Sequence, residues 1–132
     1  MNELNWLYTL KNEVLGFLEH QKSKNRKGYY NYSYRGDIYD DSKKWNIGSS
    51  VYALKIYYTL GIEKNKDIVD TTDYLKSFYH DDGQIYDDFI YKKSFIRNIA
   101  SSIKHKRWAN IFNEQYKRAE TRQAYSSLML YD

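Results

Sequence analysis

Hydrophobic and polar residues follow one another in this chain with the spacing of helices. Over residues 3–20, apolar side chains recur three and four positions apart, with Lys11, Glu13 and Glu19 between them. That spacing gathers the apolar side chains on one side of a helix. The pattern predicts an amphipathic helix over 3–20 whose apolar side holds Leu4, Leu7, Leu10, Val14, Phe17 and Leu18.

A second segment is apolar on every side. Between Ile47 and Leu60 the only charged residue is Lys55, and a helix that is apolar all round is a buried one. Gly61 follows, where a glycine commonly ends a helix. The sequence therefore predicts a buried helix over 47–60, after a non-helical stretch over 23–46.

The remaining segments also carry helical patterns. Asp67 and Asp70 resemble an N-terminal cap and predict a one-sided helix that runs to about Tyr79. A polar, basic helix or broken pair of helices is expected over 94–116, and Thr121 is expected to cap a last helix with a charge-free end at 124–131. The chain has no Pro, and no strand-like alternation persists. We therefore predict an all-α fold.

A six-residue sequence occurs nearly twice, as Gly36-Asp37-Ile38-Tyr39-Asp40-Asp41 and as Gly83-Gln84-Ile85-Tyr86-Asp87-Asp88. Internal duplication usually means that a supersecondary unit packs against copies of itself. We expect one domain over 1–132 built of α-α hairpin repeats. Repeat 1 spans about 3–61, and repeat 2 about 66–132 with a basic helical insertion at 92–117.

Composition changes this picture in two respects. The 16 Tyr outnumber the five Phe and three Trp together, and buried Tyr hydroxyls need partners, which favours a lined pocket or a wet interface; an A- and T-rich genome would explain the same bias. The chain has no Cys, which excludes disulfides and thiolate metal sites. Charges within residues 1–20 argue against a signal peptide, and no apolar run reaches membrane-spanning length. We expect a cytoplasmic protein with no membrane partner.

Charge is divided along the chain. Residues 63–88 hold eight acidic and three basic residues, whereas residues 92–122 hold nine basic and two acidic ones. The two segments can pair within the fold, or the second can expose an anion-binding face. Pairing between adjacent helices is the expectation.

Two stretches, residues 47–61 and 74–83, resemble the repeat of the terpenoid cyclases and the protein prenyltransferase β-subunits. In that repeat an inner helix ends in Leu-Gly, as at Leu60-Gly61, and an outer helix ends near a Gln that precedes Asp-Gly, as at Asp82-Gly83. Tyr79 stands in place of the Gln, and Tyr86 or Ile85 in place of the aromatic that follows. A looser copy runs from Gln21 to Gly28 and Tyr29.

The resemblance implies an (α/α) toroid, of which this chain holds about two of roughly six repeats, as an N-terminal fragment of the ring. The charge-free helix at the end of the chain fits this, since an inner helix needs a neighbour on both sides. The closely spaced acidic motif of the cyclases and the zinc-binding Cys of the prenyltransferases are not reproduced. Neither chemistry is therefore carried over, and no cofactor is expected.

The duplicated loops supply the candidate catalytic residues Asp40, Asp41, Asp87 and Asp88, with Tyr39, Trp45 and Tyr86 lining the same mouth. Paired carboxylates beside aromatic rings suit acid–base cleavage of a sugar bond or stabilisation of a cationic intermediate. The alternative is structural, because Asp is favoured at the starts of helices. His80, Asp81 and Asp82 offer oxygen ligands, but adjacent residues cannot all face one cation, so no metal site is expected.

Three functions remain open. The first is a helical scaffold without a catalytic motif, in a longer or oligomeric protein. The second is an enzyme acting on a polysaccharide or an isoprenoid. The third and least favoured is binding of single-stranded nucleic acid, for which aromatic and basic residues interleave over 24–35. Self-association or a partner chain is expected at the last helix, through Tyr125, Leu128, Met129 and Leu130.

Overall fold

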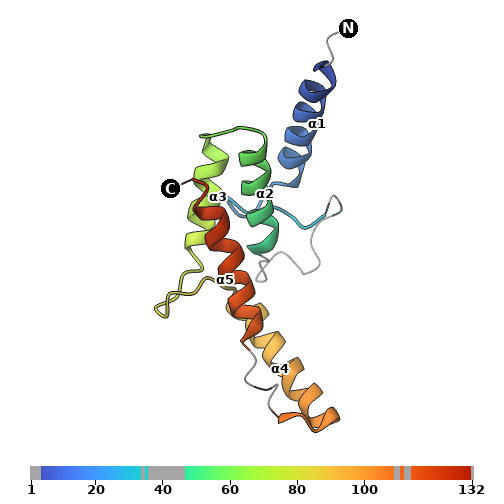
Figure 1. The fold of residues 1–132 in the computed structure, drawn as a ribbon, viewed down its shortest axis with the longest axis vertical. Helices are drawn as coiled ribbons and strands as arrows, with labels where there is room; N and C mark the ends of the chain where they lie inside the picture. Colours follow the sequence, from blue (N-terminus) through green and yellow to red (C-terminus); the bar gives the residue numbers. More distant parts are fainter. Residues whose placement is uncertain (1–3, 34, 36–46, 109–110, 112–113, 132) are drawn as a thin grey trace.

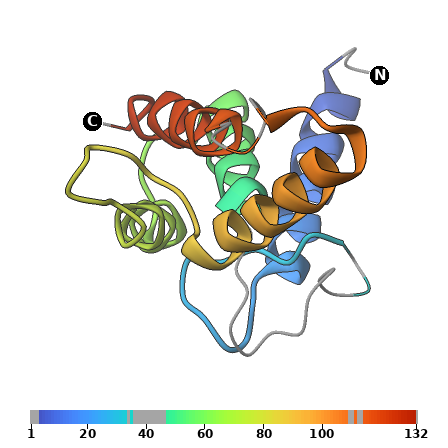
Figure 2. The same ribbon diagram turned by 90° about the horizontal axis from the view of Figure 1, so that it is seen from below.

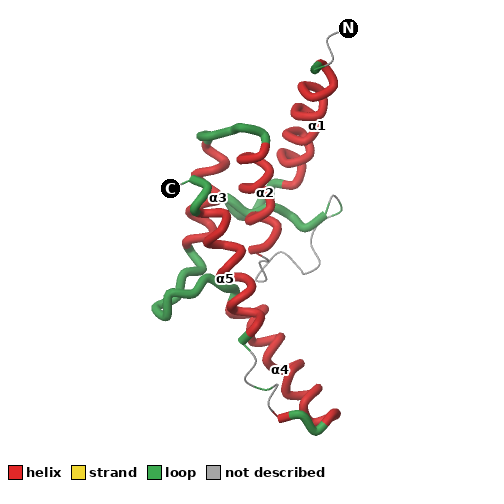
Figure 3. Tube along the Cα trace, viewed as in Figure 1, coloured by secondary structure: helices red, strands yellow, loops and turns green. Residues whose placement is uncertain are grey.

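The computed structural model describes residues 4–33, 35, 47–108, 111 and 114–131. Within these ranges the chain forms five α-helices and no strand (Figure 1, Figure 3), so the expected all-α fold is confirmed. No helix of the described residues is both long enough and apolar enough to cross a membrane. The helices are α1 (Asn5–Gln21), α2 (Ile47–Thr59), α3 (Lys66–Lys76), α4 (Asp88–His105) and α5 (Gln115–Leu128).

Helices α2, α3 and α5 pack together as the body of the molecule, while α1 and α4 project from it at opposite ends (Figure 1). Figure 2, seen from below, again places α2 between α1 and α3. The body holds the fully buried side chains of Val51 and Leu54 from α2, Leu75 from α3 and Ala124 from α5. Because burial of apolar surface is the dominant favourable term in folding, the body supplies most of the stability.

Helix α2 forms as predicted. It is buried through most of its length, and Gly61 follows it in the left-handed conformation at φ +69°. The N–H of Ile62 then donates to the carbonyl of Tyr57 at 3.0 Å. This hydrogen bond is the one expected of a glycine-terminated helix.

Among the described helices, α2 and α5 have the most extensive contact. The two segments of the chain that are nearly free of charge, 47–60 and 124–131, therefore lie side by side. The chain after α5 stays on this surface, because the hydroxyl of Tyr131 donates to the carbonyls of Leu54 at 3.1 Å and Ile62 at 3.3 Å.

Two short hairpins of the same design follow α1 and α3. An isolated antiparallel bridge joins Lys22 to Tyr30, and another joins Tyr79 to Ile85. Two residues before the second member of each bridge stands a left-handed glycine, at 28 with φ +73° and at 83 with φ +78°. The turn at Gly83 therefore corresponds in structure to the turn at Gly28, which belongs to the looser copy of the repeat. The sequence duplicate of the Gly83 loop, residues 36–41, lies outside the described part of the chain.

Two helix starts differ from the prediction for a local reason. The cap of α3 is Asn65, whose Oδ1 accepts from the N–H of Ile68 at 2.7 Å, and not Asp67. Helix α4 begins at Asp88 instead of near residue 94. In both cases a side-chain acceptor just before the helix satisfies one of its first N–H groups.

Candidate functional site

The acidic residues of the second duplicated loop serve the start of α4. Oδ1 of Asp87 accepts from the N–H of Ile90 at 2.9 Å, and only 4% of Asp87 is exposed. Asp88 is exposed in the first turn of the helix, where a negative charge is favoured by the helix dipole. Asp87 therefore fills the structural role that the sequence offered for it, as the cap of the helix that follows.

Tyr86, expected to line a mouth, is 7% exposed and packs inside the structure. Its ring stacks on His80 with the centroids 3.9 Å apart. The ammonium group of Lys117 lies 4.6 Å from the centroid of the Tyr86 ring and 4.3 Å from that of Tyr91. Among the described residues no group of His, Asp and Glu is arranged to hold a metal ion.

The other members of the predicted mouth belong to the first duplicated loop. Tyr39, Asp40, Asp41 and Trp45 lie outside the described residues. The predicted roles of these four residues stay predictions.

The second loop is held by α5 through two residues that the sequence analysis did not assign to it. Thr121 accepts from the N–H of Ile85 at 3.1 Å and donates to the carbonyl of the same residue at 3.3 Å. Glu120 accepts from the N–H of Asp87 at 3.2 Å. Thr121 was expected to cap the last helix; that prediction is wrong, because α5 begins at Gln115 and Thr121 lies within it.

The carboxyl group of Glu120 has a strongly raised pKa. Burial and the nearby charge of Asp87 raise its pKa, and hydrogen bonds from Tyr116 and from the backbone of Asp87 lower it, leaving the pKa at about 7. No local pattern singles out Glu120, because its partner lies 33 residues away in the chain. A contact of that range is visible only in the folded molecule.

Glu120 also borders a groove of about 350 Å³ between α1, α2 and α5. One wall carries Phe17 and Leu18 from α1, and the facing wall carries Tyr52 and Ile56 from α2. The other lining residues are Gln21, Tyr30, Asn31, Tyr32, Gly48, Ser49, Ala53 and Gln123. Pockets that bind ligands or peptides combine such an apolar surface with a few polar groups.

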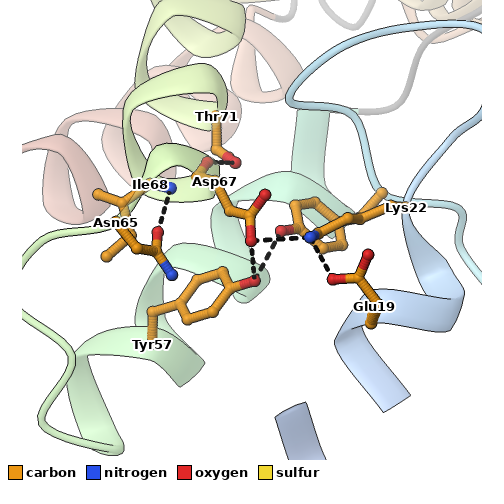
Figure 4. Close-up of polar contacts among 8 residues, drawn as sticks. Glu19, Lys22, Tyr57, Asn65, Asp67, Ile68 and Thr71 are labelled. Atoms are coloured by element: carbon orange, nitrogen blue, oxygen red, sulfur yellow. Dashed lines mark hydrogen bonds and ion pairs between the residues drawn. The ribbon is translucent and has the colours of Figure 1, made fainter. Parts of the chain in front are cut away.

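A polar cluster joins the end of α1 to α2 and α3 (Figure 4). Lys22 forms ion pairs with Glu19 and with Asp67, the latter at 2.7 Å. The hydroxyl of Tyr57 donates to Asp67 at 3.4 Å and lies 3.0 Å from the hydroxyl of Tyr30. These contacts connect four parts of the chain: α1, the first hairpin, α2 and α3.

The ionisation of this cluster follows from its burial. Burial, followed by the hydrogen bond to Tyr57, raises the pKa of Tyr30, so its hydroxyl stays protonated. Burial lowers the pKa of Lys22, but the hydrogen bonds to Asp67 and Glu19 outweigh it and the net pKa is raised. Lys22 therefore stays charged, and the hydroxyls of Tyr30 and Tyr57 stay protonated. Such a cluster suits holding helices together more than transferring protons.

The segment proposed for nucleic-acid stacking is partly used by the core. Tyr29 is 1% exposed and Tyr30 is 3% exposed, whereas Tyr32 is 59% exposed. Arg26 lies over the rings of Tyr74, at 5.0 Å, and Phe78, at 5.5 Å. Two of the rings that would stack on bases are therefore unavailable.

The ion pairs of the described residues do not join the acidic segment 63–88 to the basic segment 92–122. Within the described residues the ion pairs are those of Lys22 with Glu19 and Asp67, and of Lys27 with Asp70. All three pairs have their basic partner in residues 22–27, outside the basic segment 92–122. The basic side chains of α4 are exposed instead.

The residues expected to bind a partner at the last helix have different environments. Leu128 is 6% exposed and belongs to the core, while Tyr125 is 37% exposed and donates to the carbonyl of Gly83 at 3.0 Å. Leu130 is half-buried, and Met129 is 72% exposed. Leu128 is thus taken up by packing inside the chain.

Comparisons with known proteins leave the site to be interpreted from its geometry. No family model, no curated protein and no solved structure matches this chain.

Proposed function

We propose that this chain is a helical scaffold without catalytic activity, which associates with a second copy of itself through α1 and the groove between α1 and α2. The observation that carries the proposal is the exposure of α1. Six large apolar side chains of this helix are between 42% and 68% exposed: Leu4, Trp6, Leu7, Tyr8, Leu10 and Phe17.

Helix α1 is attached to the body only near its C-terminal end. Leu18 and Gln21 are its buried residues, and Val14 and Leu15 are half-buried. At 3.6 residues per turn, the apolar positions cover more than half of the helix circumference, which is wider than the stripe that one packed neighbour needs. An exposed apolar surface of this extent is typical of an interaction site.

The groove continues this apolar surface toward the body. Its walls, Phe17 and Leu18 on α1 and Tyr52 and Ile56 on α2, face each other as in proteins that bind an amphipathic helix in a groove. An occupant must present an apolar helix face of similar width. The projecting half of α1 has such a face, so two copies can offer each other a helix and a groove.

Charge favours the second copy as occupant. Helix α1 carries Lys11 against Glu13 and Glu19, so two α1 helices meet with little net repulsion. Burying apolar surface then contributes roughly 25 cal/mol per Å² removed from water. The basic helix α4, by contrast, would repel its own copy.

Sedimentation velocity tests the proposal. We expect the unmodified chain to form dimers with rising concentration and Leu7→Gln/Leu10→Gln to remain monomeric with unchanged helix content. The matched control is Asn5→Gln/Asn12→Gln, which places the same residue on the polar side of α1 and is expected to dimerise normally. A chain that stays monomeric at high concentration, or a Leu7→Gln/Leu10→Gln variant that associates like the unmodified chain, would contradict the proposal.

The toroid architecture remains a proposal of the same kind. Its support is the repeated order of helix, bridged hairpin with a left-handed glycine, and helix, in α1–α2 and again in α3–α4. In such a ring each unit buries its apolar side against the next. The proposed contact between copies gives α1 the neighbour that a further repeat supplies in a complete ring.

An enzyme acting on a polysaccharide or an isoprenoid is the second candidate, and the observation for it is Glu120 beside the groove with a pKa of about 7. That value suits a general acid or base. Glu120 is, however, already bonded to the backbone of Asp87. We expect no turnover of either substrate class. If the chain turned over either substrate and Glu120→Gln abolished the activity, the enzyme would become the favoured function in place of the scaffold.

A further inference from the structure

Helix α4 has a surface unlike that of α1. Phe89, Ile96 and Ile103 stand seven residues apart, so they form one stripe along the helix. Their side chains are 37%, 67% and 58% exposed. The opposite side of the helix holds the buried Ser102 and the half-buried Tyr91 and Phe95. The stripe is therefore most exposed at Ile96 and Ile103, on the side of α4 opposite its buried residue.

Basic residues flank this stripe on both sides. At 100° per residue, Lys92 falls along one edge, and Lys93, Arg97 and Lys104 fall along the other. All four are exposed. Between 88 and 108 the chain has six Lys and Arg residues against the single acid Asp88, so the exposed side of α4 is strongly positive.

The end of α4 extends the same surface. Lys106 adopts the left-handed conformation at φ 52°, and the N–H of Arg107 donates to the carbonyl of Ser102 at 3.1 Å. This turn fixes the direction in which the chain leaves the helix. Trp108, which follows, is 61% exposed. An exposed Trp beside Arg and Lys is typical of a helix that meets a membrane interface.

A shallow depression of about 520 Å³ lies beside the stripe, between α4 and Tyr116. Its lining combines the cations Lys93 and Arg97 with the apolar side chains Ile90, Ile96 and Ala100. Cationic and apolar groups side by side match an amphiphile with an anionic head.

We propose that α4 docks on the surface of an anionic lipid bilayer, with Phe89, Ile96, Ile103 and Trp108 entering the headgroup region. The flanking Lys and Arg side chains bind lipid phosphate and carboxylate groups. Binding is peripheral and reversible, because a helix lying in the interface buries only one side in lipid.

A bilayer suits this face better than the other anionic partners. Nucleic acid neutralises Lys and Arg through phosphates, but single strands are held on aromatic platforms, and the centre of the α4 stripe is aliphatic at Ile96 and Ile103. A second copy of α4 would bring positive charge against positive charge. An anionic bilayer supplies negative headgroups for the Lys and Arg side chains and an apolar acyl region beneath them for the stripe.

The test is co-sedimentation with unilamellar vesicles of phosphatidylcholine alone or mixed with phosphatidylserine. We expect binding to the mixed vesicles only, weakening with added salt because the Debye length falls from about 10 Å at 0.1 M to about 3 Å at 1 M. Arg97→Glu/Lys104→Glu is expected to bind at least about 25-fold more weakly, at roughly fivefold for each cation removed. The Trp108 fluorescence, read in a Trp6→Phe/Trp45→Phe background, is expected to shift to the blue on binding.

The control Lys64→Glu/Lys76→Glu makes the same change in net charge at exposed positions away from α4, and is expected to bind nearly as well as the unmodified chain. Ile96→Gln/Ile103→Gln keeps the charge and is expected to lose the fluorescence shift. Circular dichroism of each variant establishes that the helices are retained.

Three outcomes would overturn the proposal. The first is no binding to phosphatidylserine vesicles at low salt. The second is binding that Leu7→Gln/Leu10→Gln abolishes and Arg97→Glu/Lys104→Glu leaves intact, since the contact would then run through α1. The third is tight binding of polyuridylate, sensitive to the α4 charge reversal, with no vesicle binding; this would assign the face to nucleic acid.

Discussion

Gly28 illustrates how a single residue determines the packing of two elements. Its φ of +73° lies in the left-handed region, which residues with a Cβ rarely adopt. A Cβ built at this position would also meet the backbone of Asp70 and would lie 2.7 Å from Cβ of Tyr74. The first hairpin therefore approaches α3 more closely than any other residue would allow.

We expect Gly28→Ala to lower the free energy of unfolding by about 2–4 kcal/mol, from overpacking against a helix backbone together with left-handed strain. The matched variant is Gly83→Ala, which has φ +78° but meets only the hydroxyl of Tyr79, at 3.8 Å. It is expected to cost about 1 kcal/mol from strain alone. Urea unfolding followed by circular dichroism measures both, and equal losses would show that the contact with α3 is unimportant.

Glu120 gives the stability a dependence on pH. Its pKa is about 7 in the folded chain against 4.5 ordinarily, so the folded state holds the proton more tightly than the unfolded state. Stability from this group is complete below pH 4.5 and is lost as the pH rises through 7. The free energy of unfolding should fall by up to roughly 3 kcal/mol over that interval.

We expect Glu120→Gln to remove most of this fall, since the amide oxygen can still accept from the N–H of Asp87 and carries no charge. The comparison requires urea unfolding at several pH values from 4 to 8. Glu13→Gln, at an exposed position on α1, is the control and should keep the slope of the unmodified chain. A slope that Glu120→Gln does not change would mean that another group carries it.

At the scale of the elements, the pairing of α5 with α2 decides which C-terminal residues are available at the surface. Leu128 is 6% exposed against α2, whereas its neighbour Met129 is 72% exposed. Leu128→Ala should cost about 2–5 kcal/mol through lost burial and the cavity left behind. Met129→Ala should cost less than about 0.5 kcal/mol, as is usual for surface positions. Thermal unfolding of the two variants checks the difference, and similar losses would place α5 differently on α2.

Periodicity in the sequence was sufficient to predict the helices that carry a clear apolar pattern. Helix α1 differs from its predicted range by two residues at the start and one at the end, and α2 by one residue at its end. The start of α4 was misplaced because its first turn holds mixed residues, and the hydrogen bond from the N–H of Ile90 to the Asp87 side chain explains it. Helix α5 begins at Gln115 with no side-chain cap, so no local signal identifies its start. Local patterns show which residues favour a helix, whereas tertiary contacts decide where it begins.

The candidate site was less predictable than the fold. Asp87 and Asp88 were identified as notable, but the same residue types suit a cap and a catalytic pair, and only the folded chain shows that the Asp87 side chain caps α4. Glu120 and the groove require the approach of α1, α2 and α5. The sequence left two alternatives for the basic residues of α4, ion pairs inside the fold or an exposed positive surface. Sequence alone does not give the distances between opposite charges, which decide between the two.

Considered as a whole, the molecule has a packed body and two projecting helices, so its local stability should be uneven. We expect the slowest hydrogen exchange in α2 and α5, and faster exchange in residues 5–14 of α1, none of which is buried. If the chain dimerises through α1, protection of these residues should increase with protein concentration. Exchange followed by mass spectrometry measures this, with Leu7→Gln/Leu10→Gln as the control; protection of residues 5–14 that is already high in the dilute chain would contradict the prediction.

The attachment of α1 at one end has a mechanical consequence. The helix has 17 residues, a length of about 25 Å at 1.5 Å per residue. It acts as a lever whose pivot is the ion pair of Lys22 with Asp67. A rotation of about 20° at that pivot would carry Asn5 through about 9 Å, given the helix length. The contacts at this end of α1, the Lys22–Asp67 ion pair and the buried side chains of Leu18 and Gln21, thus set the angle at which the far end of the helix reaches another molecule. A change in these contacts would alter the geometry of assembly without changing the residues of the interface.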